Sequence, residues 1–231
     1  MKRTYKIRYL TFPGLLLCLM ISCNKPVTDF GFNGVISGTV KDASGNIVGG
    51  DITSANFIVR VQAKGDLSTI DMRVKGDGTF INDKLYPGIS RVWISGPVIA
   101  ATTDTVTLDL SGGQNIVHDF VVTPVFTIAV PVISGTPAAT SVNIIYSITA
   151  NSSKTPSKMA LYCSTVPYPN TSTGSGPFYS TVAVTLTTKS GTVNVPGLTA
   201  STQYFLRIGS QSSTTVMNYS DQIIFTTPAS K

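Results

Sequence analysis

Apolar and polar residues alternate along much of the chain, in short runs separated by glycine, asparagine and aspartate. In residues 57–64 all the odd positions are apolar, and three of the four even positions are polar. The same period of two recurs in residues 70–75 and 105–110. A period of two places every second side chain on the same face of an extended chain, so each run predicts a half-buried β-strand.

Turn-forming sequences lie between these runs. Glycine, proline, asparagine and aspartate gather at residues 42–46, 75–78, 86–88 and 111–113, where they permit the backbone angles that tight turns require. About seven short strands with turns at this spacing are typical of an antiparallel sandwich. We therefore expect residues 35–123 to form a first β-sandwich domain.

A second block of alternation fills the rest of the chain. Residues 142–148 are apolar at every even position, and shorter runs follow at 182–186 and 193–195. A short connection at residues 123–131, which runs through Pro124, separates this block from the first. We expect residues 124–231 to form a second sandwich. The predicted fold class is therefore all-β, with two antiparallel β-sandwich domains in tandem.

The N-terminal segment has a different pattern. Residues 1–8 carry four basic side chains and no acidic one. The apolar run at 10–21 that follows is shorter than the roughly 20 residues of a membrane-spanning helix. This order predicts a secretory signal peptide over residues 1–22.

The end of this segment, Met20-Ile21-Ser22-Cys23, resembles the lipobox of bacterial lipoproteins, with Met20 where leucine is usual. The resemblance implies that cleavage leaves Cys23 as a lipid-bearing N-terminus. Residues 23–34 would then be the lipidated cysteine and a polar tether. An ordinary signal peptide with a chance cysteine is the alternative.

The charge balance changes when the signal peptide is removed. The remaining chain has 13 basic and 11 acidic residues, a formal net charge of +2. No basic stripe is visible in it, which argues against a nucleic-acid partner. Residues 124–231 carry five basic residues and only one acid, Asp221. This mildly basic half reflects either ordinary scatter or attraction for an acidic glycan.

Three sequences of the first block resemble the carboxypeptidase regulatory-like, or transthyretin-like, domain. They are Gly38-Thr39-Val40-Lys41-Asp42 followed by Gly45, the turn Gly76-Asp77-Gly78-Thr79-Phe80, and the turn Leu85-Tyr86-Pro87-Gly88. In that family a G-x-V-x-D strand opens the sandwich, and D-G-x-F and L-x-P-G turns flank a short strand. The chain departs from the family in Ile89-Ser90-Arg91, because the family usually has a tyrosine two positions after the glycine of the Pro-Gly turn. The resemblance implies a non-catalytic accessory domain.

The closing segment, residues 195–227, resembles the end of a fibronectin type III module. In such modules a leucine six residues before a tyrosine builds a corner between two strands, and the tyrosine hydroxyl bonds back to the backbone. Leu198 and Tyr204 have this spacing. The order of lipobox, regulatory-like sandwich and Ig-like sandwich is similar to a family of unknown function among Bacteroides-group lipoproteins. That resemblance implies a place in nutrient capture, with SusC/SusD-type proteins of polysaccharide-utilisation systems as partners.

The sequence contains few candidate catalytic or metal-binding residues. The only histidine, His118, shares strand parity with apolar neighbours, which favours a partly buried structural role over that of a general base. Asp77 and Asp83 could face each other as a catalytic pair, but a hairpin turn explains them better. With Asp71 they lack the spacing of a calcium loop. Cys163 has the parity of a buried, unreactive thiol. We expect no enzyme, no cofactor and no metal site.

One strand offers a candidate sugar-binding surface. A sugar site needs an accessible aromatic ring surrounded by polar groups. In residues 89–95 Val92 and Ile94 have the parity of core positions, which leaves Arg91 and Trp93, the only tryptophan, on the opposite face. Arg91 and Trp93 are therefore candidate ligand-binding residues. The alternative is that Trp93 packs against the other domain or sheet.

Two more surfaces come from the second block. Tyr162 and Phe205, together with Ile224, have parities opposite to the core and would form one exposed apolar patch on a shared sheet. A patch of this kind more often faces a partner protein than a sugar. A long loop with prolines and glycines carries Tyr168 and Phe178, which are further candidate ligand-binding residues.

These features together predict a non-catalytic, lipid-anchored protein of the outer membrane, facing either the cell surface or the periplasm. It would be a glycan-binding or accessory component of a SusC/SusD-type polysaccharide-utilisation system. The alternative is a structural or adhesion-type surface lipoprotein that binds only protein partners.

Overall fold

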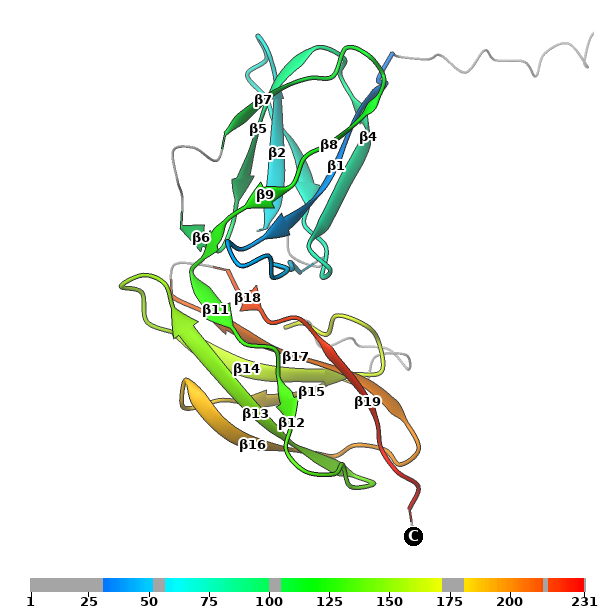
Figure 1. Ribbon diagram of the computed structural model, residues 1–231, viewed down its shortest axis with the longest axis vertical. Helices are drawn as coiled ribbons and strands as arrows, with labels where there is room; N and C mark the ends of the chain where they lie inside the picture. The colour runs from blue at the N-terminus through cyan, green and yellow to red at the C-terminus, as the bar shows by residue number, and fades with distance from the viewer. Residues whose placement is uncertain (1–30, 52–56, 100–104, 172–180, 214–215, 231) are drawn as a thin grey trace, which may run out of the picture. The chain divides into compact units, whose positions relative to one another are not determined.

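The computed structural model describes residues 31–51, 57–99, 105–171, 181–213 and 216–230. The described residues form strands, turns and loops but no helix, which confirms the predicted all-β class (Figure 1). Among the described residues there is therefore no helix that is long and apolar enough to cross a membrane. Phe32–Lys231 form one compact unit. The predicted signal peptide and Cys23 lie outside the described residues.

Two sheets build the first sandwich. One has the strand order β4-β1-β8, with β9 also pairing with β1, and the other has the order β3-β2-β5-β7 (Figure 1). The first sheet consists of β1 (Gly34–Lys41), β4 (Thr79–Leu85), β8 (Asn115–Val117) and β9 (Phe120–Val121). The second consists of β2 (Ile58–Ala63), β3 (Ile70–Arg73), β5 (Ile89–Ser95) and β7 (Val106–Asp109). A hydrophobic core that includes Ile36, Val59, Phe80 and Val92 lies between them.

The alternation of the sequence marks the buried positions of this sandwich. Val59 and Val61 of β2 are buried, and Met72 of β3 is buried between exposed Asp71 and Arg73. Strand propensity and periodic burial therefore agree along these strands, as they do in a sandwich with one face toward the core. The turns between the strands use glycines with positive φ, for example 84° at Gly45, a conformation that favours glycine.

The pairing of β1 differs from the rest. All other strand pairs in the described part of the chain are antiparallel, but β1 runs parallel to β8 and β9. The chain crosses from β7 in one sheet to β8 in the other, where β8 runs in the same direction as β1. Gly38 of β1 permits a close approach at this point, since a Cβ atom there would overlap the carbonyl oxygen of His118 and lie 2.8 Å from Phe80.

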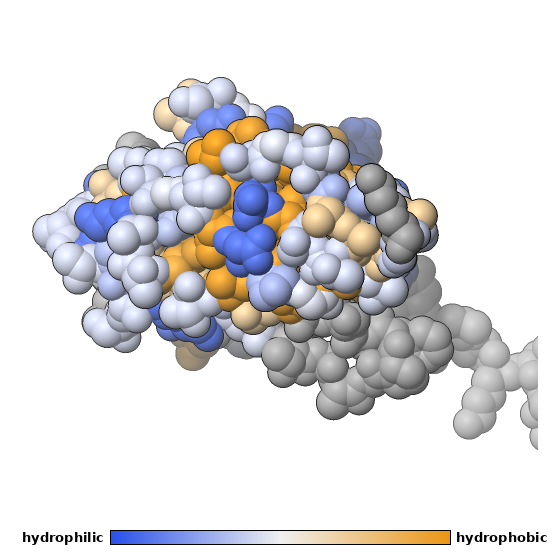
Figure 2. Space-filling view, turned by 90° about the horizontal axis from the view of Figure 1, so that it is seen from below, coloured by the Kyte–Doolittle hydropathy of each residue, from blue (hydrophilic) through white to orange (hydrophobic). Residues whose placement is uncertain are grey.

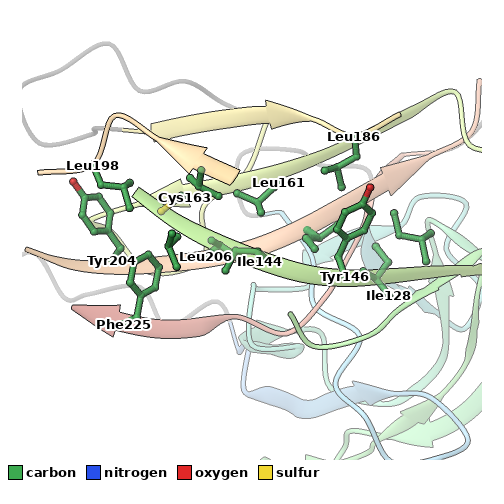
Figure 3. Close-up of a cluster of buried hydrophobic side chains, with 14 of the residues drawn as sticks. Ile128, Ile144, Tyr146, Leu161, Cys163, Leu186, Leu198, Tyr204, Leu206 and Phe225 are labelled. Carbon is green, nitrogen blue, oxygen red and sulfur yellow. The ribbon is translucent and has the colours of Figure 1, made fainter. Parts of the chain in front are cut away.

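The second sandwich also has two sheets. One consists of β11 (Phe126–Ile128), β13 (Ser141–Ala150), β12 (Val132–Ile133) and β16 (Ser190–Pro196), with β13 pairing with the other three. The other has the order β15-β14-β17-β18, with β19 on β17, and consists of β14 (Lys158–Ser164), β15 (Thr181–Thr185), β17 (Gln203–Gln211), β18 (Asn218–Tyr219) and β19 (Ile223–Thr226). Figure 3 shows its core between the two sheets, with Ile144, Leu161 and Leu206 fully buried.

Cys163 belongs to this core. Its side chain is buried among apolar residues, with the sulfur directed into the cluster (Figure 3). Burial raises the pKa of the Cys163 thiol to about 12, so the thiolate is not formed at neutral pH. The prediction of a buried thiol is confirmed.

The corner predicted from the fibronectin-like segment is present. The backbone N–H of Thr199 donates a hydrogen bond of 2.9 Å to the hydroxyl oxygen of Tyr204. Leu198 and Tyr204 are both buried and lie next to each other at one end of the core (Figure 3). The Tyr204 hydroxyl therefore holds the loop before β17 against the strand that follows it.

We expect Tyr204→Phe to lower the free energy of unfolding by about 1–3 kcal/mol, because it leaves the partly buried Thr199 N–H without its acceptor while keeping the ring. Urea denaturation followed by circular dichroism measures the change. Tyr86→Phe is the control, since Tyr86 is 48% exposed and its loss of a hydroxyl should change stability by less than about 0.5 kcal/mol. Equal effects of the two substitutions would contradict the role of the corner.

The connection predicted at residues 123–131 is itself built of strands. β10 (Thr123–Pro124) pairs with β6 (Val98–Ile99) of the first half, and Phe126 begins β11 of the second. Asn218 fixes this connection, because its side-chain oxygen accepts from the N–H of Phe126 at 3.0 Å and its amide donates to the carbonyl of Pro97 at 2.9 Å. Strand pairing and a buried amide therefore hold the two sandwiches together at this point.

A buried polar cluster, the Arg207 cluster, forms a second contact between the sandwiches. It comprises Gly50, Asp51, Pro169, Asn170, Arg207 and Tyr219. Arg207 is 1% exposed. Its Nη1 donates to the carbonyl oxygen of Gly50 at 3.2 Å, and its Nε donates to the carbonyl oxygen of Pro169. Its guanidinium carbon lies 3.7 Å from the centre of the Tyr219 ring, which is a cation–π distance.

Asp51 is the acidic member of the Arg207 cluster. Its carboxylate accepts hydrogen bonds from the Tyr219 hydroxyl at 3.0 Å and from Asn170 Nδ2 at 2.8 Å. Burial lowers the pKa of Arg207 to about 10, against the opposing effects of Tyr219 and Asp51. Arg207 is therefore still cationic at neutral pH. Burial, and then the negative charge of Asp51, raise the pKa of Tyr219, which keeps its hydroxyl protonated and able to donate.

Candidate functional site

The candidate site lies on the face of β5 that is turned away from the core. Val92 is fully buried and Ile94 is 8% exposed, because alternate side chains of a strand point to opposite faces of its sheet. Arg91 is therefore exposed, and Trp93 is partly buried, on the outer face. The sequence placed both residues on this face correctly. The only tryptophan of the chain thus retains part of its surface for contact with a ligand.

Polar side chains of the neighbouring strands surround these two residues. Arg60 of β2 lies directly opposite Trp93, and Gln62 lies opposite Arg91. On the other side Thr107 of β7 also lies opposite Arg91. Cross-strand neighbours of this kind lie about 4.5–5.5 Å apart. An aromatic ring with hydrogen-bonding groups on three strands is the arrangement expected of a sugar-binding sheet face.

A groove of about 440 Å³ opens on this face at the Arg91 end of β5. It is lined by Gln62, Ala63, Lys64, Gly65, Asp66, Ile89, Arg91 and Thr107. The backbone N–H of Lys64 donates to the carbonyl of Ile89 at 2.8 Å, so Lys64 lies opposite Ile89, two residues before Arg91, and lines the same groove. The volume is in the range of ligand-binding clefts.

The charged groups of the groove differ in whether they already have partners. The Asp66 carboxylate accepts from the N–H and the hydroxyl of Ser68 at 3.0 and 2.9 Å, and these bonds lower the pKa of Asp66. Arg60 pairs with Asp71 at 3.2 Å. The Arg91 and Lys64 side chains make no hydrogen bond or ion pair with any residue in the described part of the chain. Their charges are available to a ligand.

A second cavity, of about 330 Å³, lies where the two sandwiches meet. Its lining includes Asp42 and Asn46 of the first sandwich and Phe126, Tyr219 and Asp221 of the second. Asp42 is already bound by the backbone N–H groups of its own turn. The two aromatic residues are at most 5% exposed and offer no ring face for stacking. This cleft is therefore less suited to a sugar than the face of β5.

The candidates of the long loop do not join the β5 site. Tyr168 has a φ of 57° and its N–H donates to the side-chain oxygen of Gln222 at 2.7 Å. Its ring packs against Gly76 of the first sandwich, where a Cβ atom would overlap it, and lies 6.0 Å from the Arg207 guanidinium. Tyr168 is thus a packing residue between the sandwiches. Phe178 lies outside the described residues.

The exposure predicted for Tyr162 is wrong. Tyr162 is 3% exposed, because Met217 and Tyr219 pack with it and with Ala160 on the outer face of the sheet. Its hydroxyl lies 3.6 Å from the sulfur of Met217. What remains of the predicted patch is Phe205, which is partly buried, and Ile224, its direct neighbour across the β17–β19 pair.

Other apolar side chains are exposed on the second sandwich. Val132 of β12 and Ile145 of β13 lie directly opposite each other and are 57% and 46% exposed. Figure 2 shows the protein from below the view of Figure 1, with apolar surface around a small hydrophilic group. Such surfaces are candidates for protein contacts.

Catalytic and metal-binding arrangements were sought among the same residues. His118 is partly buried, and its ring meets the ring of Phe120 edge-on at 4.7 Å, as predicted for a structural histidine. Asp77 accepts from the N–H and hydroxyl of Thr79 within its turn, and Asp83 is exposed on β4. No group of three or more histidine, cysteine or acidic side chains comes together in the described ranges.

Sequence reasoning missed Arg207 altogether. Its position on β17 alternates with the core residues Leu206 and Ile208, which predicts an exposed side chain. Its partner Gly50 is 157 residues away in the chain, so no local pattern could reveal the contact. An arginine in a strand of otherwise uncharged residues was the only available signal.

Comparisons with known proteins show what the fold is similar to. No family model matches the chain, and a search of curated proteins finds no match. Among solved structures, a DUF3823 family protein from Parabacteroides merdae has 18% identity and a TM-score of 0.62, covering 83% of this chain and 98% of that one. A DUF3823 family protein from Bacteroides ovatus has 17% identity and a TM-score of 0.59, covering 83% and 97%. A Bacteroides uniformis protein, provisionally described as carbohydrate-binding, has 16% identity and a TM-score of 0.64, covering 85% and 100%.

Proposed function

We propose that this protein is a non-catalytic, lipid-anchored component of the outer membrane that binds glycan on the outer face of β5. In this proposal it serves a SusC/SusD-type polysaccharide-utilisation system as an accessory protein. The observation that carries the proposal is Trp93, which lies beside a groove lined by Arg91 and Lys64, whose side chains have no partner among the described residues. The likeness in fold to a protein provisionally described as carbohydrate-binding supports it.

The chemistry of the β5 face suits a sugar. A pyranose ring has an apolar face that stacks on an aromatic ring and hydroxyl groups at its edge that need hydrogen-bond partners. Trp93 supplies the aromatic surface, and Gln62, Arg91 and Thr107 supply donors and acceptors on adjoining strands. The face is an open groove on a rigid sheet, so a long polymer could lie across it without threading into a closed pocket.

A binding role accords with the state of the acidic groups. Hydrolysis of a glycoside normally needs two carboxylic groups that face one bond, one of them kept protonated. Asp66, the acid that lines the groove, is held by Ser68, and these hydrogen bonds lower its pKa. An anionic carboxylate of this kind does not serve as a general acid.

The membrane anchor in this proposal is Cys23. Each methylene group of an acyl chain that enters the bilayer contributes about 0.8 kcal/mol, so two or more chains would give stable attachment. Residues 24–34 would then connect the anchor to the first sandwich, whose first strand begins at Gly34. We expect the Cys23→Ser variant to lose its association with the membrane, which cell fractionation measures.

We expect Trp93→Ala to weaken glycan binding by at least about tenfold, which corresponds to about 1.4 kcal/mol, because the stacking surface is lost. The measurement is affinity electrophoresis of residues 24–231 in gels that contain plant, host or microbial polysaccharides, followed by calorimetry with any polymer that retards the protein. Circular dichroism checks that the variant is folded.

Phe205→Ala is the matched control, because Phe205 is also a partly buried aromatic residue on an outer strand face, but of the second sandwich. It should leave glycan binding unchanged. If no polymer retards the protein, the glycan proposal fails. The protein-partner alternative then leads, and it rests on the exposed Ile224 beside Phe205. In that case Phe205→Asp should abolish capture of the partner from outer membranes while Trp93→Ala should not.

A further inference from the structure

We infer that the glycan bound on the β5 face is acidic, with carboxylate groups on its sugar units. This inference rests on the proposed glycan-binding function and adds the chemical class of the ligand. It follows from which charged groups of the face have partners and from their positions relative to Trp93.

The basic groups of the groove lack partners. Arg91 and Lys64 line it from β5 and from the end of β2, and neither side chain contacts an acid in the described ranges. A guanidinium group presents a planar fork of donors that matches the two oxygens of a carboxylate. A neutral sugar would satisfy these donors only singly, through hydroxyl groups. Two free cations in one groove therefore favour an anionic ligand.

The acidic groups nearby are directed elsewhere. Asp71 pairs with Arg60, and Asp66 binds the N–H and hydroxyl of Ser68. Asp109, which lies opposite Ile89 at the rim, accepts from the N–H of Ser111 at 3.0 Å and from its hydroxyl. Each of these carboxylates has donors from its own turn or its own pair. None of them neutralises the charge of Arg91 or Lys64 by direct contact.

The spacing along β5 places a carboxylate within reach. Arg91 and Trp93 are two residues apart on the same face, which corresponds to about 6.5 Å along a strand. A sugar ring stacked on Trp93 would therefore carry a carboxylate at its edge toward the Arg91 guanidinium. The groove continues past Ile89 to Lys64, where the next acidic unit of the same polymer would find a second cation.

The test compares an acidic polymer with its uncharged methyl ester, and adds a second acidic polymer. Residues 24–231 are titrated with polygalacturonate, with its fully methyl-esterified form and with alginate, by calorimetry and affinity electrophoresis at low and high salt. We expect binding to polygalacturonate or alginate, at least tenfold weaker binding to the methyl ester, and weaker binding as salt rises. Arg91→Gln should weaken binding of the acidic polymer at least tenfold.

Lys84→Gln is the matched control. It removes one positive charge, but Lys84 is exposed on β4 of the opposite sheet, so it should leave the affinity unchanged. If Lys84→Gln weakens binding as much as Arg91→Gln, the polymer binds by net charge alone and the inference is overturned. Equal affinity for the charged and esterified polymers, with loss of both on Trp93→Ala, overturns the inference but supports glycan binding. Failure of both acidic polymers to bind overturns the inference, and failure of the whole panel of plant, host and microbial polysaccharides overturns the proposed function as well.

Discussion

Replacing Arg207 with alanine should lower the free energy of unfolding by about 3–5 kcal/mol. This is the cost expected when one member of a buried charged network is removed and the others remain buried. The substitution takes donors from the carbonyl groups of Gly50 and Pro169, and it removes the cation that faces Tyr219 and lies near Asp51. It also leaves a cavity, since Arg207 is among the largest fully buried side chains of the described residues.

The effect should be specific to the contact between the sandwiches. Gly50 and Asp51 precede β2 of the first sandwich, whereas Arg207 and Tyr219 belong to β17 and β18 of the second. Without Arg207 we expect the two sandwiches to unfold less cooperatively. Trp93, the only tryptophan, lies in the first sandwich, so its fluorescence follows that half, while far-ultraviolet circular dichroism follows both. In urea, the two signals should coincide for the native protein and separate for Arg207→Ala.

Arg60→Ala is the control for this experiment. Arg60 is also a strand arginine with an acidic neighbour, but its side chain and that of Asp71 are 39% and 43% exposed. Surface ion pairs of this kind contribute about 0–1 kcal/mol. A loss of stability in Arg207→Ala no larger than that in Arg60→Ala would show that the Arg207 cluster does not stabilise the fold.

The contrast between these two arginines shows what the sequence can reveal. Arg60 alternates with core residues and is partly exposed, as its parity predicts. Arg207 has an equally clear parity, yet it is buried because Gly50 and Pro169 cover it. Alternation predicts which face of a sheet a side chain is on, but it cannot predict whether another part of the chain covers that face.

The same limit explains the outcome at the candidate sites. Trp93 and Arg91 were placed correctly because their own strand, β5, decides which of its residues enter the core. The face of Tyr162 was predicted correctly, but Met217 and Tyr219 bury it. These two residues lie 55 or more positions later in the chain, so no local pattern could reveal the contact. Tyr204 could be predicted in detail because both partners of its hydrogen bond lie within one local motif. Local chemistry was therefore predictable, and contacts between distant segments were not.

A second substitution with a large expected effect is Gly38→Ala in β1. A methyl group at this position would overlap the carbonyl oxygen of His118, lie 2.7 Å from its carbonyl carbon and lie 2.8 Å from the ring of Phe80. Rotation of a side chain cannot relieve a clash with backbone, so β1 and the β8–β9 segment must move apart. We expect a loss of about 3 kcal/mol or more, at the upper end of the cost of overpacking.

Gly112→Ala is the matched control for Gly38→Ala. The nearest atom to a Cβ at position 112 is Cγ of Gln114, at 3.8 Å, so alanine fits there and should leave stability unchanged or raise it by about 0.4–1 kcal/mol. Urea denaturation followed by Trp93 fluorescence reports on the first sandwich in both variants. Similar midpoints for the two variants would mean that the parallel contact of β1 with β8 and β9 yields easily. A much lower midpoint for Gly38→Ala would show that this contact closes the sandwich. The candidate glycan site is on β5, which belongs to the other sheet from Gly38. The folded Gly38→Ala variant should therefore still bind glycan, and binding should be lost only at urea concentrations where Trp93 fluorescence shows unfolding.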